Sequence, residues 1–202
     1  NKHQKYGCNK AKFFHKRKYN LMDKIEKHNF LPYPELKTNR LILRCLDKTD
    51  EEEVFFFRSD PRILEYLDRP PATKIEEARA HIEMILNGIR NGEWIDWSIT
   101  LSGKNQLIGS IGLWNISIEE NRAEIGYALH PDYQGKGIMN EATKAVIEYG
   151  FKKMKLKTIV ANLSPHNLNS ITLLEKNNFQ KGPIKKDSET IQYFLENGLV
   201  GE

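Results

Sequence analysis

Apolar and polar residues recur along this chain at two spacings, one typical of strands and one typical of helices. Residues 41–46 predict a short strand, and residues 50–58 predict a short helix that begins with acidic side chains. Residues 74–91 predict a longer amphipathic helix, because apolar side chains recur at helical spacing after Thr73, which can act as its cap. Prolines interrupt the region between the two helices, and Asn91-Gly92 ends the second one.

The remainder of the chain predicts further strands around two more helices. The predicted strands span residues 94–100, 106–114, 122–129, 157–163, 179–184 and 190–196. The predicted helices span residues 137–154 and 167–176, and the first has an inward stripe of Met139, Ala142, Val146 and Tyr149 or Gly150. The strands on either side of the first helix should lie parallel, because a right-handed crossover joins them. We therefore predict a mixed α/β sheet flanked by helices.

The most specific chemical signal lies between the strand at 122–129 and the helix that follows it. Residues 133–142 read Tyr-Gln-Gly-Lys-Gly-Ile-Met-Asn-Glu-Ala, and their two glycines let a ligand approach the backbone closely. The first amides of a helix are free donors at the positive end of its dipole, so we predict that the N–H groups from Gln134 to Asn140 bind a diphosphate. The nucleoside-triphosphate pattern G-x-x-x-x-G-K-[ST] is absent, and the NAD pattern G-x-G-x-x-G fails at Asn140.

This loop resembles the cofactor loop of the GNAT superfamily of acyl-CoA-dependent N-acetyltransferases, which reads Gln or Arg, two residues, Gly, one residue, then Gly or Ala. Here the matching positions hold Gln134, Gly137 and Met139, and the methionine departs from the usual pattern. Other segments match in the expected order, namely residues 38–44, 108–113, 123–129, 167–170 and 174–179. The resemblance covers residues 36–196 and is closest to the branch that acetylates the N-termini of ribosomal proteins.

The resemblance implies a GNAT-like fold, in which a central, mostly antiparallel sheet contains one parallel pair of strands that splay apart. Acetyl-CoA (coenzyme A) would be the cosubstrate, with its pantetheine arm between the strands at 122–129 and 157–163. The main chain of Tyr127 and Leu129 would pair with pantetheine, while their side chains are typical of a core. The predicted cofactor-binding residues are Tyr127, Leu129, Gln134, Gly135, Lys136, Gly137, Met139, Asn140 and Asn167. Asn167 is also a good helix N-cap.

Two residues are candidates for acid–base catalysis. Glu124 shares a strand face with Gly126 and Ala128, whose small size leaves space for a substrate, so its carboxylate is a candidate base. A surface or structural ion pair is the alternative for this residue. Many family members use a tyrosine as the acid at the position held here by Leu174, whereas the ribosomal-protein branch has a serine at the position of Ser170. Ser170 is therefore the candidate proton donor, although it also suits the first turn of a helix.

The implied reaction is direct attack of a primary amine on the thioester. An α-amino group has an ordinary pKa of about 7.7 to 8.0, against about 10.4 for lysine, so it needs less help from a base. We expect a protein or peptide N-terminus as the acceptor; a small-molecule amine, such as a polyamine or an aminoglycoside, is the alternative. A third hypothesis is an inactive acyl-CoA-binding sensor, which the departure at Leu174 suggests. Trp94, Trp97 and Trp114 either line an acceptor pocket or belong to the core.

Composition bounds these hypotheses. With 202 residues and 39% hydrophobic content, the chain can form one core, and we predict a single domain at residues 22–202. Residues 1–21 contain seven basic residues and no acidic one, so the net charge of +4 becomes −3 without them. We interpret residues 1–21 as a basic extension outside the functional fold, non-native or disordered; an arm that binds nucleic acid or ribosomes is the alternative.

Several further expectations concern partners and environment. No apolar stretch approaches the roughly 20 residues that cross a bilayer, so a soluble cytoplasmic protein without membrane contact is expected, either a monomer or a homodimer. Nucleic acid is not an expected partner of the acidic folded domain. Cys8 and Cys45 should be reduced thiols. No metal site is expected, because His81 and His166 lack partners at ligand spacing and suit surface or capping positions.

Overall fold

The computed structural model describes residues 28–67, 69–183 and 189–198, so the interpretation of residues 1–21 lies outside the described residues. Within these ranges the strands form a single sheet in the order β1-β2-β3-β4-β5-β6-β8-β7. The strands are β1 (Leu36–Lys37), β2 (Leu41–Arg44), β3 (Ile95–Leu101), β4 (Gly109–Ser117), β5 (Arg122–Leu129), β6 (Thr158–Leu163), β7 (Gln180–Lys181) and β8 (Ile191–Glu196). Every pair is antiparallel except β5 with β6, which confirms the predicted mixed sheet.

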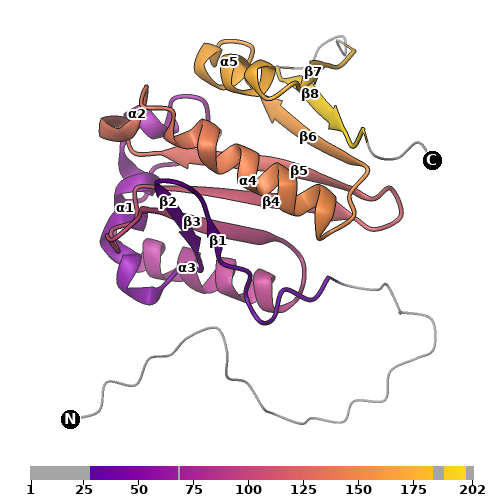
Figure 1. Cartoon of the computed structure of the whole chain (residues 1–202). Helices are drawn as coiled ribbons and strands as arrows, with labels where there is room; N and C mark the ends of the chain where they lie inside the picture. The colour runs from indigo at the N-terminus through magenta and orange to yellow at the C-terminus, as the bar shows by residue number, and fades with distance from the viewer. Residues whose placement is uncertain (1–27, 68, 184–188, 199–202) are drawn as a thin grey trace.

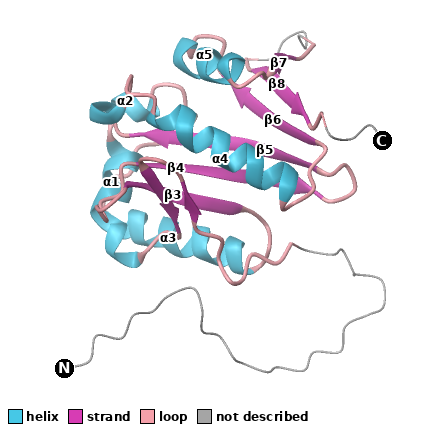
Figure 2. Ribbon diagram, in the orientation of Figure 1, coloured by secondary structure: helices cyan, strands magenta, loops and turns pink. Residues whose placement is uncertain are grey.

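Helices cover both faces of this sheet. The helical elements are η1 (Lys48–Asp50), α1 (Glu51–Ser59), α2 (Pro61–Leu64), α3 (Ile75–Arg90), η2 (Pro131–Tyr133), α4 (Ile138–Lys152) and α5 (Leu168–Lys176). Figures 1 and 2 show α4 lying along the middle of the sheet, with α5 beside the outer strands β6 to β8. On the opposite face, Trp94 links α3 to the sheet, because its indole donates a hydrogen bond to the carbonyl of Ile85 and stacks on Trp114 of β4.

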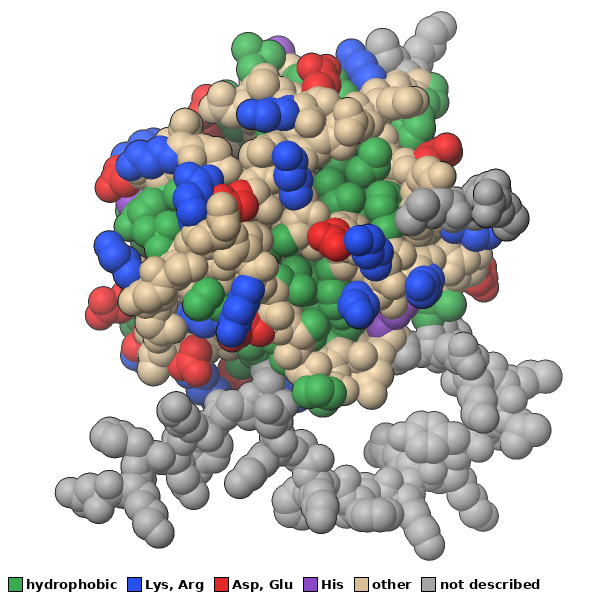
Figure 3. Space-filling view, in the orientation of Figure 1, with side chains coloured by type: hydrophobic (Ala, Val, Ile, Leu, Met, Phe, Trp, Pro, Cys, Tyr) green, Lys and Arg blue, Asp and Glu red, His purple; other side chains and the backbone are tan. Residues whose placement is uncertain are grey.

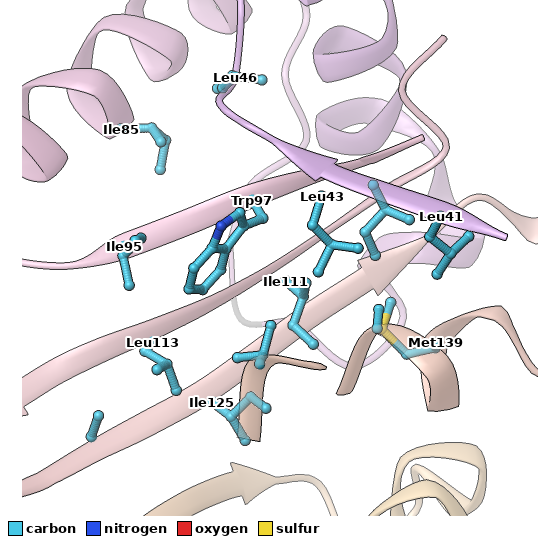
Figure 4. Close-up of a cluster of buried hydrophobic side chains, with 14 of the residues drawn as sticks. Leu41, Leu43, Leu46, Ile85, Ile95, Trp97, Ile111, Leu113, Ile125 and Met139 are labelled. Carbon is cyan, nitrogen blue, oxygen red and sulfur yellow. The ribbon is translucent and has the colours of Figure 1, made fainter. Parts of the chain in front are cut away.

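The main core lies between α4 and the sheet. Side chains that alternate along β2, β3, β4 and β5 point toward α4 from one face, as strand geometry requires. Trp97 is fully buried there, with its ring edge-to-face on Tyr149 of α4 and its indole N–H bound to the carbonyl of Pro34. Figure 4 shows Trp97 among Leu43, Ile111 and Ile125, with Met139 of α4 close by. Trp97 is therefore a core residue.

Local capping departs from the sequence prediction in two places. Thr73 does not cap α3 as an acceptor; instead its N–H and hydroxyl both donate to Oε1 of Glu77, each at 3.0 Å. The carboxylate in the first turn therefore supplies the cap, as in the reciprocal half of a capping box. The sequence also missed α2, a single turn in which Asp60 accepts from the N–H of Arg62 and Pro61 holds the first position.

Charge on the described surface is mixed. Figure 3 shows basic side chains interspersed with acidic ones on the α4 side of the molecule, without a broad single-sign patch among the residues drawn in colour. No helix in the described ranges is both long enough and apolar enough to span a bilayer.

Candidate active site

The parallel strands β5 and β6 pair over only three positions. Arg122, Ala123 and Glu124 face Thr158, Ile159 and Val160, and beyond this point no residue of β5 pairs with β6. The later part of β6 pairs instead with β8, as far as Leu163 with Ile191. The two strands therefore separate after Glu124, and Figure 2 shows β6 turning away from β5. This splayed arrangement is the one that the resemblance implied for these strands.

The glycine loop, residues 134–140, leads from the end of β5 into α4. Gly135 and Gly137 have φ angles of +71° and +72°, a left-handed conformation that glycine adopts without strain. The N–H of Glu141 is the first in α4 to bond back, to the carbonyl of Gly137. Among the described residues, the amides of Gly135 to Asn140 have no acceptor. Gln134 differs, because its N–H donates to Pro131, so the free donors begin at Gly135, one residue later than predicted.

Side chains around the loop hold it rather than fill it. The amide group of Gln134 donates to the carbonyl of Leu129 at 3.1 Å, which fixes the loop to the end of β5. Lys136 donates to the carbonyl of Asp132 at 2.7 Å. Met139 is 9% exposed and packs in the core, so only its backbone amide is available at the loop. The carbonyl oxygen of the Asn140 side chain accepts from Asn177 at the end of α5.

A network that the sequence reasoning missed fastens the loop to the turn before β2. The carboxylate of Glu141 accepts from the hydroxyl of Thr38 at 2.6 Å, from the N–H of Arg40 at 2.9 Å and from Nε of Arg40 at 2.6 Å. Arg40 also donates to the carbonyl of Lys136 at 3.0 Å. Burial opposes ionisation of Glu141, but hydrogen bonds from Thr38 and Arg40 outweigh it and lower its pKa. The acidic residue in the first helical turn was the available signal.

The candidate acid lies beside a tyrosine across the opening between β5 and α5. Asn167 caps α5, because its side-chain oxygen accepts from the N–H of Ser170 at 3.1 Å. The side chain of Ser170 lies near that of Tyr127 and tends to lower the Tyr127 pKa, against the larger effect of burial. Burial raises the pKa of Tyr127 to about 12, so its hydroxyl stays protonated at neutral pH. The site therefore holds a pair of hydroxyl groups, of which the sequence identified only Ser170.

Glu124, the candidate base, lies at the last paired position before β5 and β6 separate. Its side chain is half-buried and Oε2 accepts from the side-chain amide of Asn115 at 2.9 Å. No ion pair of Glu124 occurs among the described residues, so the amide of Asn115 is the polar group that its carboxylate contacts there. Leu174 of α5 is fully buried and belongs to the core, and its hydrocarbon side chain has no proton to donate.

One expectation about the histidines was wrong. His81 is not a surface or capping group: it is half-buried, Nδ1 lies 3.3 Å from the guanidinium of Arg58, and burial lowers its pKa to about 4. His166 is exposed. In the described ranges, His, Cys, Asp and Glu side chains form no group of three that could hold a metal. Trp94 and Trp114 are half-buried and stacked, with ring centroids 5.1 Å apart.

A cavity of about 380 Å³ lies elsewhere, between α4, α5 and β8. Its lining includes Lys144, Phe151, Asn177 and Leu195 but none of the predicted catalytic or cofactor-binding residues. We therefore place the candidate site at the glycine loop and the splayed strands, where the free donors and the candidate catalytic side chains lie.

Comparison with known proteins identifies the family of the chain. Residues 40–180 match the family model of the GNAT acetyltransferase domain. The chain is 36% identical over 154 residues to p20 of Bacillus licheniformis, which is named an uncharacterized N-acetyltransferase; the match covers 76% of this chain and 86% of that protein. It is 26% identical to the [ribosomal protein uS5]-alanine N-acetyltransferase of Escherichia coli, covering 78% of this chain and 84% of that one.

A solved structure extends the likeness to the fold. RimL, a ribosomal L7/L12 alpha-N-protein acetyltransferase in complex with coenzyme A, matches with a TM-score of 0.73 at 21% identity, covering 81% of this chain and 98% of that chain. The family predicted from the loop and its companion segments is thus confirmed, together with its fold. The chain belongs to the GNAT acetyltransferase family and is an N-acetyltransferase.

Proposed function

We propose that this enzyme transfers an acetyl group from acetyl-CoA to a primary amine, a protein or peptide N-terminus, by direct attack on the thioester. The observation that carries the proposal is the run of free amides from Gly135 to Asn140 at the mouth of the splayed strands. These donors lie at the N-terminus of α4, where the helix dipole also favours an anion.

The residues present fit coenzyme A. At Gly135 a Cβ atom would meet nothing within 4 Å, and at Gly137 it would meet only the guanidinium of Arg40, at 3.6 Å. The backbone is therefore open to a diphosphate at both glycines, and Arg40 adds a positive charge beside it. Beyond Glu124, the main chain of β5 has no β6 partner and can pair with the amides of pantetheine. When bound, acetyl-CoA supplies the activated acetyl group.

Each catalytic side chain then has a defined task. Glu124 accepts the proton of the incoming ammonium, directly or through a water, so that the neutral amine can attack. The hydroxyl pair of Ser170 and Tyr127 donates to the sulfur as the thiolate leaves. Asn167 holds Ser170 in place through the cap of α5. This division of roles needs no residue at the position of Leu174.

An N-terminal acceptor is supported by two arguments. A relative whose match covers 78% of this chain is named as an alanine N-acetyltransferase of ribosomal protein uS5. An α-amino group also has a lower ordinary pKa than lysine, so part of it is already neutral near pH 7, and a single half-buried carboxylate can accept the proton of the remainder.

The loop assignment is tested by Gly137→Val, measured by calorimetry with coenzyme A. A valine at φ +72° strains the left-handed backbone and places methyl groups where the diphosphate binds. We expect the dissociation constant to rise at least about tenfold, since one or more charge-assisted hydrogen bonds are lost. Gly103→Val is the control, because Gly103 has φ +80° and open space around it in a distant turn. Equal affinity of the two variants would refute the assignment.

The acceptor is tested by thiol release from acetyl-CoA with peptides of different N-terminal residues, polyamines and aminoglycosides. Turnover restricted to peptides supports the proposal, and turnover restricted to small amines replaces the acceptor with that class. Binding of acetyl-CoA without turnover on any compound would favour a sensor and end the enzymatic proposal.

A further inference from the structure

A buried carboxylate outside the catalytic set has no partner. Asp96 of β3 is 7% exposed, and its side-chain oxygens accept no hydrogen bond and form no ion pair among the described residues. Its main-chain carbonyl alone is engaged, by the hydroxyl of Tyr33 at 2.6 Å. Burial raises the pKa of Asp96 to about 7, and no charged side chain of α3, β4 or β5 in the described ranges contributes to the shift. An unpaired buried carboxylate destabilises a fold, so packing does not explain this residue.

The sheet register brings this carboxylate toward the active site. Asp96 pairs with Gly112 of β4, and Gly112 pairs with Gly126 of β5. A Cβ on Gly112 would lie 2.6 Å from Oδ2 of Asp96 and 2.7 Å from Nε1 of Trp114. The carboxylate and the indole N–H therefore lie over the same glycine. Neither has a partner among the described residues.

Glu124 belongs to the same face of the sheet. Glu124 pairs with Trp114 of β4 and lies two residues before Gly126 in β5. Because side chains alternate along a strand, its side chain lies on the same face of the sheet as that of Asp96. Over Gly126, a Cβ would lie 3.6 Å from the ring of Trp114, an ordinary contact distance, so small atoms fit there. Neighbouring strands are about 4.8 Å apart, which puts the Asp96 carboxylate roughly 5 to 10 Å from the reaction centre beside β5.

Trp114 is held rigidly beside this carboxylate. Its ring stacks on Trp94, with an interplanar angle of 30°, and Trp94 is fixed by its hydrogen bond to Ile85 of α3. Gly88 provides the space for Trp94, because a Cβ there would lie 1.9 Å from the indole. The carboxylate is thus the group that would attract an ammonium or guanidinium, and the stacked indoles form an apolar wall beside it.

We propose that Asp96 and Trp114 form an acceptor subsite, which binds a second positively charged group of the substrate while its attacking amine lies beside Glu124. The inference rests on the proposed function and narrows its substrate class: the acceptor carries a cation a few bonds from the nitrogen that is acetylated. A diamine meets this description, and so does a peptide whose second residue is lysine. An acceptor with a methyl group in place of the cation would leave Asp96 unpaired and bind less well.

Turnover tests the subsite with matched acceptors. The probes are 1,4-diaminobutane against n-butylamine, and peptides that begin alanine-lysine against alanine-glutamine. Within whichever of the two acceptor sets reacts, we expect the wild type to have a lower KM for the acceptor with the second cation. The difference should be at least about tenfold, the size of effect seen when one partner of a buried ion pair is removed. Asp96→Asn should abolish this preference with kcat changed less than about threefold, because the subsite holds the substrate rather than the reacting atoms.

A matched control separates this role from a general effect on the sheet. Ser98 follows on the same face of β3, is 1% exposed and has an unpartnered hydroxyl, so Ser98→Ala perturbs the same region without removing a charge. This variant should keep the preference for the charged acceptor. A loss of preference in both variants would assign the effect to packing and overturn the proposal.

A second measurement does not depend on turnover. The carbon-13 signal of the Asp96 carboxyl group, identified by its loss in Asp96→Asn, is titrated with pH in saturating 1,4-diaminobutane and in n-butylamine. A bound second cation stabilises the carboxylate, so the diamine should lower its pKa by about one unit or more, while the monoamine leaves it unchanged. No shift with the diamine would overturn the subsite even if the enzyme is active. If the diamine lowers the pKa of Asp96 but no acceptor is acetylated, the subsite is supported and the proposed function is refuted.

Discussion

Two carboxylates on one face of the sheet have different surroundings. Glu124 is half-buried and accepts a hydrogen bond from Asn115, whereas Asp96 is almost fully buried and has no partner in the described residues. A carboxylate at the reaction centre should govern the chemical step, and one that is deeply buried should govern how stability depends on pH. The two residues can therefore be separated by different measurements.

For Glu124, the expected signature is kinetic. Glu124→Gln keeps the size of the side chain but cannot accept a proton, so kcat should fall by about 10²- to 10⁴-fold, the usual contribution of a general base. Affinity for coenzyme A, measured by calorimetry, should not change, because the carboxylate lies outside the glycine loop. Glu120→Gln, an exposed residue in the preceding turn, is the control. An unchanged rate and pH profile would remove Glu124 as the base.

For Asp96, the expected signature is a stability slope. Its folded pKa is about 7, against an ordinary value of 3.8, so the folded state retains a proton that the unfolded state releases. Stability should therefore fall as pH rises from about 4 to about 7, by an amount on the order of 4 kcal/mol. Asp96→Asn should flatten this slope in denaturant titrations at several pH values. The two proteins are compared by this slope and not by their absolute stability, because burying the asparagine amide itself changes the free energy of unfolding.

The control for this titration is Asp132→Asn, which changes an exposed aspartate near the glycine loop. Its slope between pH 4 and pH 7 should match that of the wild type. An equally steep slope in Asp96→Asn would show that Asp96 is ionised in the folded protein at these pH values.

At the scale of elements, the glycine loop depends on a contact that is distant in sequence. Glu141 in the first turn of α4 joins the loop to the turn before β2 through Thr38 and Arg40. Side-chain exposures of 50% for Arg40 and 19% for Glu141 place this pair partly in solvent, so its net contribution to stability is modest. Its larger effect should be on the conformation of the loop, because Arg40 also holds the carbonyl of Lys136.

Glu141→Ala should therefore weaken coenzyme A binding several-fold and lower the melting temperature by a few degrees, as expected when a hydrogen-bonded carboxylate is removed. Calorimetry and thermal unfolding measure the two effects. Glu148→Ala in the same helix is the control: it removes an exposed i, i+4 pair with Lys152 at 2.8 Å and should change neither quantity appreciably. Equal effects of the two variants would contradict a specific role for Glu141.

At the scale of the whole molecule, the splay divides the sheet into two parts. Strands β1 to β5 form one, and β6 to β8 form the other, joined by three paired positions of β5 and β6 and by contacts such as Gly150 of α4 against Ile159 of β6. A ligand in the opening would contact both parts of the sheet. It would take the place of the hydrogen bonds that β5 and β6 do not make with each other beyond Glu124.

Coenzyme A at about 100 times its dissociation constant should accordingly stabilise the protein by about 2.7 kcal/mol and raise its melting temperature by about 5 to 10 °C. Hydrogen exchange should slow at residues 125–129 and 161–163, on the two sides of the opening. Gly137→Val should show neither effect. Protection confined to other parts of the sheet would contradict the assigned binding mode.

The sequence alone determined the order and type of most elements, because strand and helix periodicities are local properties. It also predicted the glycine loop as a candidate site, because the free donors there depend only on consecutive residues and on the start of one helix. Local patterns identified neither α2 nor the cap that Glu77 supplies to α3. At the start of α3, Thr73 and Glu77 are both possible capping groups and lie close together in the chain, so the sequence could not rank them.

Only the tertiary structure decided which distant groups share a site. Tyr127 and Ser170 meet across the opening, Glu141 reaches Arg40, and Asp96 lies two strands from β5 on the face of Glu124. Their proximity depends on strand order and register, which no single segment encodes. The unpaired state of Asp96 is likewise a property of its surroundings, because burial and the absence of a counter-charge arise only when β3, β4 and α3 are packed together.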